Sequence, residues 1–211
     1  MSENRILWGV GTSRTIRAHW ALIELNLSYK TEIIRTRTTD TETAAFKSVN
    51  PRQKIPVLQD GTLTMGESAA IVTYLAESYS TEQVSLIPDN PKARAKYFEW
   101  MSFICMELDA TSLYVLRRHW SLPEIYGDSP IANKASEEYF NRMITAADKL
   151  KNPKQKYLLE TGFSGVDILM TTTLKWAIDY NQKIPNDFME YLDHMGNRSG
   201  YIAAIEANKM P

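Results

Sequence analysis

The sequence has few of the residues that form disulfides and metal sites. Its 211 residues include one cysteine, Cys105, and three histidines, His19, His119 and His194. A single cysteine excludes a disulfide within the chain and fits a reducing compartment, so we expect a cytoplasmic location. None of the histidines lies at metal-ligand spacing from Cys105, so we expect no zinc site and no other metal cofactor.

An excess of charge of one sign and a long apolar run are also missing. Lys and Arg number 24 against 25 Asp and Glu, which gives a formal net charge of −1. Non-specific binding to nucleic acid or to a membrane surface needs a basic excess, so we expect neither partner. No stretch approaches the ~20 apolar residues that span a bilayer. The opening MSENRILWGV lacks the pattern of a signal peptide.

A strand, a helix and a second strand open the chain. Residues 5–10 form a short apolar run, residues 16–27 carry apolar side chains at helical spacing, and residues 29–34 alternate polar and apolar side chains. Because a crossover helix joins the two strands, we expect them to pair in parallel with a right-handed connection.

The following residues complete a small mixed sheet. Residues 39–46 begin with the N-cap chemistry of a short helix. The pair Asp60-Gly61 is a hairpin signal between two short strands, and an amphipathic helix starts after Gly66. The predicted order over residues 1–80 is therefore βαβαββα, an α/β fold.

The rest of the chain has the pattern of an all-helical domain. The stretch from Tyr79 to Pro91 is rich in Ser and Thr, and within it residues 81–90 form a linker. Asn90-Pro91 supplies a cap followed by proline at the first helical position. Beyond it, helical patterns occupy residues 93–118, 135–150, 166–181 and 187–194. We therefore expect two domains, residues 1–80 and residues 91–211.

Three motifs resemble those of the cytosolic glutathione S-transferases. They are Ile55-Pro56-Val57-Leu58 with Asp60-Gly61, Glu67-Ser-Ala-Ala-Ile71, and Phe163-Ser164-Gly-Val-Asp167-Ile168, which is similar to the capping box and hydrophobic staple of that family. The resemblance covers essentially the whole chain. It implies a thioredoxin-like domain that binds glutathione over residues 1–80 and an all-helical domain over residues 91–211; the subclass is not assigned.

The resemblance implies that the catalytic residue lies in the turn Gly11-Thr12-Ser13-Arg14. A free thiol has a pKa near ~8.5, and a hydroxyl donor beside a helix N-terminus stabilises its thiolate. The serine of many subfamilies falls at Thr12, and Ser13 is the alternative one residue later. The turn holds no tyrosine or cysteine, so it is of the serine/threonine type. The competing interpretation is that these hydroxyls only cap the helix.

Five residues are implied to bind glutathione. Ile55-Pro56 resembles the cis-proline dipeptide of the family, whose backbone pairs with the cysteinyl part of glutathione like an added strand. Glu67 and Ser68 open a helix, where Ser68 receives the γ-glutamyl carboxylate and Glu67 lies near the amine. Lys54 holds the ligand backbone or its glycine carboxylate. The competing interpretations are a trans turn, plain helix capping and a solvated lysine.

The resemblance also places a second substrate between the two domains, against the long helix. Aromatic residues between 97 and 120 supply apolar surface there, and Trp8 and Tyr114 are our candidates for the pocket. We expect a homodimeric glutathione transferase that joins the thiolate of glutathione, its co-substrate, to small hydrophobic electrophiles. The alternatives are peroxide reduction, dehalogenation or isomerisation with glutathione, or a non-catalytic binding or regulatory protein.

Overall fold

The computed structural model describes residues 5–210, so the ends of the two predicted domains, residues 1–4 and residue 211, lie outside the described residues. The described chain forms two compact units. Unit 1 consists of residues 5–87 together with residues 197–210, and unit 2 is Pro88–Gly196. The last residues, expected with the helical domain, thus belong to the N-terminal unit, because a helix that they form packs against an early helix of the chain.

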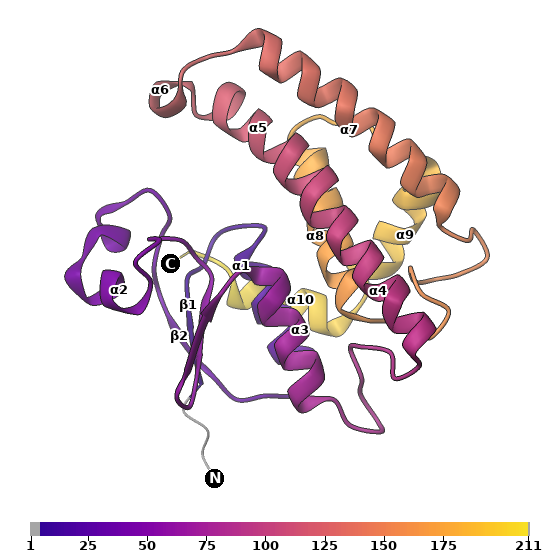
Figure 1. Ribbon diagram of the computed structural model, residues 1–211, viewed down its shortest axis with the longest axis horizontal. Coiled ribbons are helices and arrows are strands. Elements are labelled where there is room, and N and C mark those ends of the chain that lie inside the picture. The colour runs from indigo at the N-terminus through magenta and orange to yellow at the C-terminus, as the bar shows by residue number, and fades with distance from the viewer. Residues whose placement is uncertain (1–4, 211) are drawn as a thin grey trace. The chain divides into compact units, whose positions relative to one another are not determined.

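Unit 1 is built on a four-stranded mixed sheet with the strand order β2-β1-β3-β4. Figure 1 shows this sheet with β1 and β2 labelled. The strands are β1 (Arg5–Trp8), β2 (Lys30–Glu32), β3 (Val57–Asp60) and β4 (Leu63–Gly66). β1 and β2 are parallel, as predicted, whereas β3 is antiparallel to both β1 and β4. The parallel pair needs a crossover, which α1 (Thr15–Glu24) supplies.

The remaining helices of unit 1 are η1 (Thr39–Glu42), α2 (Ala44–Val49), α3 (Ser68–Tyr79) and α10 (Ser199–Ala207). The predicted βαβαββα order and the thioredoxin-like fold are confirmed. α1 packs against both α3 and α10. Trp20 and Leu22 of α1 and Leu75 of α3 are fully buried in the resulting core.

Unit 2 is helical in its described residues. Its helices are α4 (Pro91–Phe103), η2 (Ile104–Leu113), α5 (Tyr114–Leu116), η3 (Arg117–Ser121), α6 (Pro123–Tyr126), α7 (Pro130–Leu150), α8 (Gly165–Asp179) and α9 (Asn186–Gly196). The predicted cap of α4 is present, because Asn90 Oδ1 accepts hydrogen bonds from the N–H groups of Lys92 at 2.9 Å and Ala93 at 3.3 Å. Within residues 5–210 no helix is long and apolar enough to cross a membrane.

The long helical pattern that begins at residue 93 is not uniform in the structure. η2 and η3 are π-helical, and they flank the short α5. The wider turns of a π-helix rotate the side chains that follow relative to a regular α-helix. Helical periodicity does not reveal such turns, so the sequence predicted one continuous helix.

Helix α8 begins with the predicted capping box of Ser164 and Asp167. The Asp167 carboxylate accepts hydrogen bonds from the N–H of Ser164 at 2.9 Å and from its hydroxyl at 3.1 Å. The N–H of Leu158 at 2.9 Å and the Tyr191 hydroxyl at 3.0 Å also donate to it. Burial nevertheless raises the pKa of Asp167 to about 6.

Candidate functional site

One end of the sheet of unit 1 gathers the segments that hold the predicted site residues. Trp8 is paired with Val57, and Val57 is paired with Gly66. Because neighbouring strands here run antiparallel, the chain leaves β1, enters β3 and leaves β4 at the same end. The turn with Thr12 follows β1 at this end, the segment that ends in Pro56 precedes β3 here, and α3 follows β4 here. All three segments therefore start or finish at the same end of the sheet.

The Thr12 hydroxyl caps helix α1. Its Oγ1 accepts hydrogen bonds from the backbone N–H of Thr15 at 3.0 Å and of Arg14 at 3.3 Å. It also lies 3.0 Å from Thr15 Oγ1, where either oxygen can be the donor. The capping contacts use the lone pairs of the Thr12 oxygen and leave its proton available for donation.

Ser13, the alternative residue, is in a different position. Its side chain is half-buried, and within residues 5–210 its hydroxyl forms no hydrogen bond. Thr12 is thus part of the helix cap, while Ser13 is not.

Ser68 is the first residue of α3 and is linked to α1. It is buried, and its Oγ accepts a hydrogen bond of 3.2 Å from Nη1 of Arg17, which is 1% exposed. The unpaired N–H groups and the dipole of α3 make its N-terminus attractive to an anion, and the Arg17 guanidinium adds a full positive charge there. A hydroxyl that accepts from Arg17 keeps its own proton for another acceptor.

Glu67 has an unusual backbone conformation. Its φ of 66° lies in the left-handed region, which is uncommon and costly for a residue with a side chain. Its carboxylate forms an ion pair of 2.9 Å with Arg52. The Arg52 side chain passes over Gly66, where an added Cβ would lie 2.4 Å from Arg52 Nη2. Gly66 thus leaves the space through which Arg52 reaches Glu67.

The Ile55–Pro56 peptide bond is cis, as predicted. Within residues 5–210 neither the N–H nor the C=O of Ile55 takes part in a backbone hydrogen bond. The Ile55 side chain lies against Gly9, whose φ is 112° and where an added Cβ would be 2.6 Å from Ile55 Cβ. The side chain of Lys54 is exposed and forms no ion pair in this described part of the chain, while its carbonyl accepts a hydrogen bond of 2.7 Å from Asn50.

The two residues predicted for a substrate pocket belong to different units. Trp8, in unit 1, donates from Nε1 to Gln59 at 2.8 Å, and its ring lies 6.1 Å from that of Phe46. Tyr114, in unit 2, has the Arg118 guanidinium over its ring at 4.9 Å. Both are half-buried.

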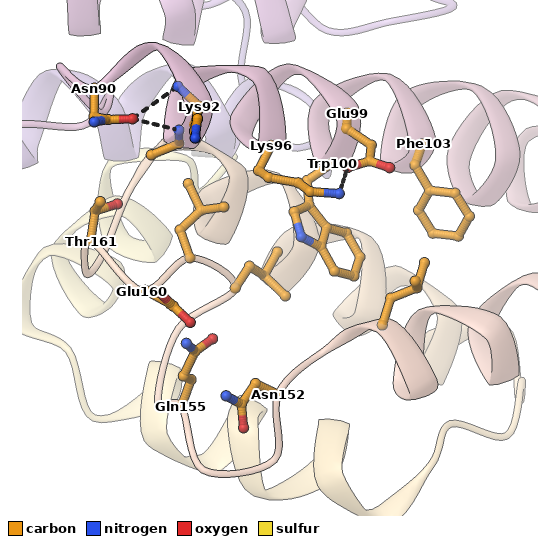
Figure 2. A pocket seen from close by; sticks show the side chains of 14 residues that line it. Asn90, Lys92, Lys96, Glu99, Trp100, Phe103, Asn152, Gln155, Glu160 and Thr161 are labelled. Atoms are coloured by element: carbon orange, nitrogen blue, oxygen red, sulfur yellow. Dashed lines mark hydrogen bonds and ion pairs between the residues drawn. The ribbon is translucent and has the colours of Figure 1, made fainter.

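Unit 2 contains a cavity of about 680 Å³ of its own, between α4 and the segment that joins α7 to α8 (Figure 2). Trp100 and Phe103 of α4 line it, together with the Lys96–Glu99 ion pair of 2.6 Å at its margin. Leucines at 150, 158 and 159 complete the apolar lining. None of its lining residues is among the predicted glutathione-binding residues, all of which lie in unit 1.

Known proteins are similar to this chain in sequence and in fold. Residues 13–78 match the family model described as the glutathione S-transferase N-terminal domain. Over these residues the chain is similar to the N-terminal domain of the glutathione S-transferases. Glutathione S-transferase A of Pleuronectes platessa is 24% identical over 164 residues, which are 77% of this chain and 72% of that protein.

Another relative is named for a different reaction. Dichloromethane dehalogenase of Methylophilus leisingeri is 30% identical over 115 residues, 52% of this chain and 40% of that protein. A glutathione transferase homolog of Lodderomyces elongisporus, solved with two GSH per subunit, has the same fold. It superposes with a TM-score of 0.86 at 17% identity and covers 98% of this chain and 99% of that chain.

Among the residues that touch predicted site residues without having been predicted are Arg52, Thr15 and Asn208. Arg52 pairs with Glu67, and Thr15 and Asn208 contact the turn that holds Thr12. The motif Asn50-Pro51-Arg52, ahead of the cis proline, was a signal for Arg52. Asn208 gave no signal, because 196 positions separate it from Thr12.

Proposed function

We propose that this glutathione S-transferase homologue is an enzyme that binds glutathione on unit 1 and transfers its thiolate to small hydrophobic electrophiles. The observation that carries the proposal is the convergence of three features at one end of the sheet. They are a capping hydroxyl, an Ile55 whose N–H and C=O form no backbone hydrogen bond within residues 5–210, and a helix terminus that attracts anions. Each of these three features suits one part of a tripeptide thiol.

Thr12 is our first choice for the residue that stabilises the thiolate. Two backbone N–H groups already donate to its oxygen, which polarises the hydroxyl and makes its proton a stronger donor. A hydrogen bond from this hydroxyl to sulfur, beside the positive end of α1, lowers the pKa of the thiol. Ser13, whose hydroxyl forms no hydrogen bond within residues 5–210, is the alternative donor.

The rest of glutathione is expected to lie along the same end of the sheet. The N–H and C=O of Ile55, presented by the bond to Pro56, pair with the cysteinyl residue as an added strand does. Ser68 and the start of α3 receive the γ-glutamyl carboxylate. Glu67, oriented by Arg52, faces the amine. Lys54 is available for the glycine carboxylate.

The second substrate and the assembly are further parts of the proposal. We propose that Trp8 and Tyr114 contribute to the electrophile pocket. We also propose a homodimer. Sedimentation or light scattering at several protein concentrations tests the dimer independently of activity.

A conjugation assay with aryl halides, isothiocyanates and epoxides tests the activity. The sulfur–carbon bond forms while a halide leaves the aryl halide, while the epoxide ring opens and its oxygen takes up a proton, or while the nitrogen of the isothiocyanate takes up a proton. The conjugate is therefore measured with every substrate, and the released halide is measured with the aryl halides. The dehalogenase relative favours adding dichloromethane to the panel. Tight glutathione binding without any product would instead support a binding or regulatory protein, and activity only with peroxides or isomerisable substrates would support those reactions.

Variants of the turn test the catalytic assignment. Thr12→Ala is expected to raise the pKa of the bound thiol and to lower turnover at neutral pH about tenfold per unit of pKa. Thr12→Ser is the matched control, because it keeps the hydroxyl. Ser13→Ala is expected to have little effect. If Ser13→Ala produces the loss and Thr12→Ala does not, the roles are exchanged, and if neither does, the hydroxyl mechanism is wrong.

A further inference from the structure

Asn208, directly after helix α10, is bound to the turn that holds Thr12. The N–H of Gly11 donates to the backbone carbonyl of Asn208 at 2.9 Å and to its Oδ1 at 3.1 Å. Asn208 Nδ2 donates to the carbonyl of Thr12 at 3.2 Å, and the Thr15 hydroxyl donates to Asn208 Oδ1 at 2.6 Å. A single amide side chain thus contacts Gly11 and Thr12 in the loop between β1 and α1, and Thr15, the first residue of α1.

The direction of these hydrogen bonds follows from the protons available. Thr15 has one hydroxyl proton and three oxygens in reach: Asn208 Oδ1 at 2.6 Å, Thr12 O at 2.9 Å and Thr12 Oγ1 at 3.0 Å. The amide oxygen is the nearest. The Thr12 carbonyl already accepts from Asn208 Nδ2 and from the N–H of Ile16, each at 3.2 Å. The proton of Thr15 therefore goes to Asn208.

This assignment determines what Thr12 can do. Thr15 Oγ1 accepts a hydrogen bond from the N–H of Thr12 at 2.9 Å. Because Thr15 donates its one hydroxyl proton to Asn208 Oδ1, it cannot also donate to Thr12 Oγ1. Thr12 Oγ1 already accepts hydrogen bonds from two backbone N–H groups, which occupy both of its lone pairs. The one further hydrogen bond that this hydroxyl can form is therefore the one in which it donates its proton. With no ligand the proton points to Thr15, and a thiolate is a stronger acceptor to which it can turn.

We propose that Asn208 is a positioning residue that sets the direction of the Thr15 and Thr12 hydroxyl protons and so makes Thr12 the donor to the thiolate. The inference rests on the proposed function. The inference goes beyond the proposed function because it assigns a role to Asn208, which lies almost 200 positions from the turn and is marked by no sequence motif.

The surroundings hold Asn208 in place. Its own N–H donates to the carbonyl of Ala204 at 3.0 Å at the end of α10. Two residues later Met210 lies against Gly11, where an added Cβ would be 2.7 Å from Met210 Cγ. Gly11 has a φ of 77°, which also favours glycine. The close approach of the two segments therefore depends on a residue without a side chain at position 11.

The test measures the pKa of the glutathione thiol bound to the protein, by the ultraviolet absorbance of the thiolate as a function of pH. Asn208→Ala is expected to raise this pKa by about one unit, which lowers kcat about tenfold at pH values below the pKa. KM for glutathione is expected to stay within about threefold, because Asn208 does not contact the proposed peptide site. Lys209→Ala, which removes the neighbouring exposed side chain, is the matched control and is expected to match the wild type.

A double-mutant cycle shows whether Asn208 acts through Thr15. Thr15→Val removes the hydroxyl at nearly constant shape and is expected to raise the thiol pKa, whereas Thr15→Ser is expected to leave it unchanged. Adding Asn208→Ala to Thr15→Val is expected to raise the pKa no further. Additive effects of the two substitutions would contradict the proposed route.

The outcomes separate this inference from the proposed function. If the wild type does not lower the thiol pKa of glutathione, the proposed function fails. If the wild type lowers it and a folded Asn208→Ala variant lowers it equally, the inference fails and the proposed function stands. If Asn208→Ala does not fold, Thr15→Val and Thr15→Ser carry the test, and equal thiol pKa values in these two variants overturn the inference.

Discussion

The hydrogen bond between Arg17 and Ser68 connects two helices at the start of α3. Both side chains are buried, at 1% and 6% exposure. The guanidinium has no acceptor capacity, so the Ser68 oxygen must accept from it and the Ser68 proton remains for a third group. A carboxylate at the N-terminus of α3 would complete this chain of donors, and it would gain from both the helix dipole and the cation.

We therefore predict that Ser68→Ala weakens glutathione binding and leaves the chemical step intact. A hydrogen bond to a charged group contributes about 1.5–3 kcal/mol, which corresponds to a roughly 10- to 100-fold increase in the dissociation constant. kcat at saturating glutathione is expected to change little, because Ser68 is proposed to contact the carboxylate and not the thiol. Titration calorimetry and steady-state kinetics measure the two quantities.

Ser78→Ala is the matched control, since Ser78 lies on the same helix with an exposed side chain. It is expected to bind glutathione like the wild type. Equal dissociation constants for Ser68→Ala and Ser78→Ala would contradict the assignment of the carboxylate to this helix terminus.

At the scale of elements, the docking of α10 on α1 connects the end of the described chain to the proposed site. Arg198 forms two hydrogen bonds with the Glu24 carboxylate, at 2.6 and 2.8 Å, and Trp20 Nε1 donates to the same carboxylate at 2.8 Å. Gly200, in the first turn of α10, lies so close that an added Cβ would be 2.2 Å from Glu24 Oε1. Glu24 cannot move aside without losing these bonds.

Gly200→Ala is accordingly predicted to destabilise the protein by about 1–3 kcal/mol, the usual cost of overpacking a well-packed contact. The gain in helix propensity from glycine to alanine, at most about 1 kcal/mol, does not offset this cost. Denaturant unfolding measures the change. Gly196→Ala, at the end of α9 with open space around its Cβ position, is the matched control, and it is expected to be neutral or slightly stabilising.

The elements that were predicted well are those whose signal is local. The strands and helices up to residue 80 follow from periodicity and turn chemistry, and the capping box of Ser164 and Asp167 follows from spacing. Helix α10 was missed because it has nine residues with a glycine in its first turn, and it is held by contacts with α1 that are distant in sequence.

The candidate site divides in the same way. The turn with Thr12, the cis proline and the start of α3 are marked by short motifs, so the sequence points to them. Asn208 reaches the site only through tertiary packing, and no periodicity or spacing relates it to its partners. Arg52 lies in the motif ahead of the cis proline, but its ion pair with Glu67, 15 positions away, forms only in the folded chain. The choice between Thr12 and Ser13 depends on the hydroxyl network, which is likewise a property of the folded chain.

At the scale of the whole molecule, each unit holds a buried group whose pKa is shifted, and the two respond oppositely to acid. In unit 1, burial lowers the pKa of His19 to about 4, from 6.5. The folded state thus favours neutral His19, and the stability that this contributes is complete above pH 6.5 and is lost as the pH falls toward 4. In unit 2, Asp167 has a raised pKa of about 6, from 3.8. Its contribution is complete below pH 3.8 and is lost as the pH rises through 6.

Acidification from pH 7 to about pH 4.5 is therefore predicted to weaken unit 1 and to strengthen unit 2, each by on the order of 2 kcal/mol. Proteolysis at increasing denaturant concentration, with identification of the cleaved segments, shows which unit unfolds at the lower concentration. In acid, cleavage within residues 5–87 is expected to begin at the lower denaturant concentration. His19→Gln is expected to lower the stability of unit 1 and to make that stability less dependent on pH. Asp167→Asn is expected to remove the increase in the stability of unit 2 in acid.

His119→Gln, in η3, is the control, and the order in which its two units are cleaved is expected to match the wild type. Simultaneous cleavage of both units at every pH, or an acid response that survives in His19→Gln, would contradict the assignment of opposite titrations to the two units.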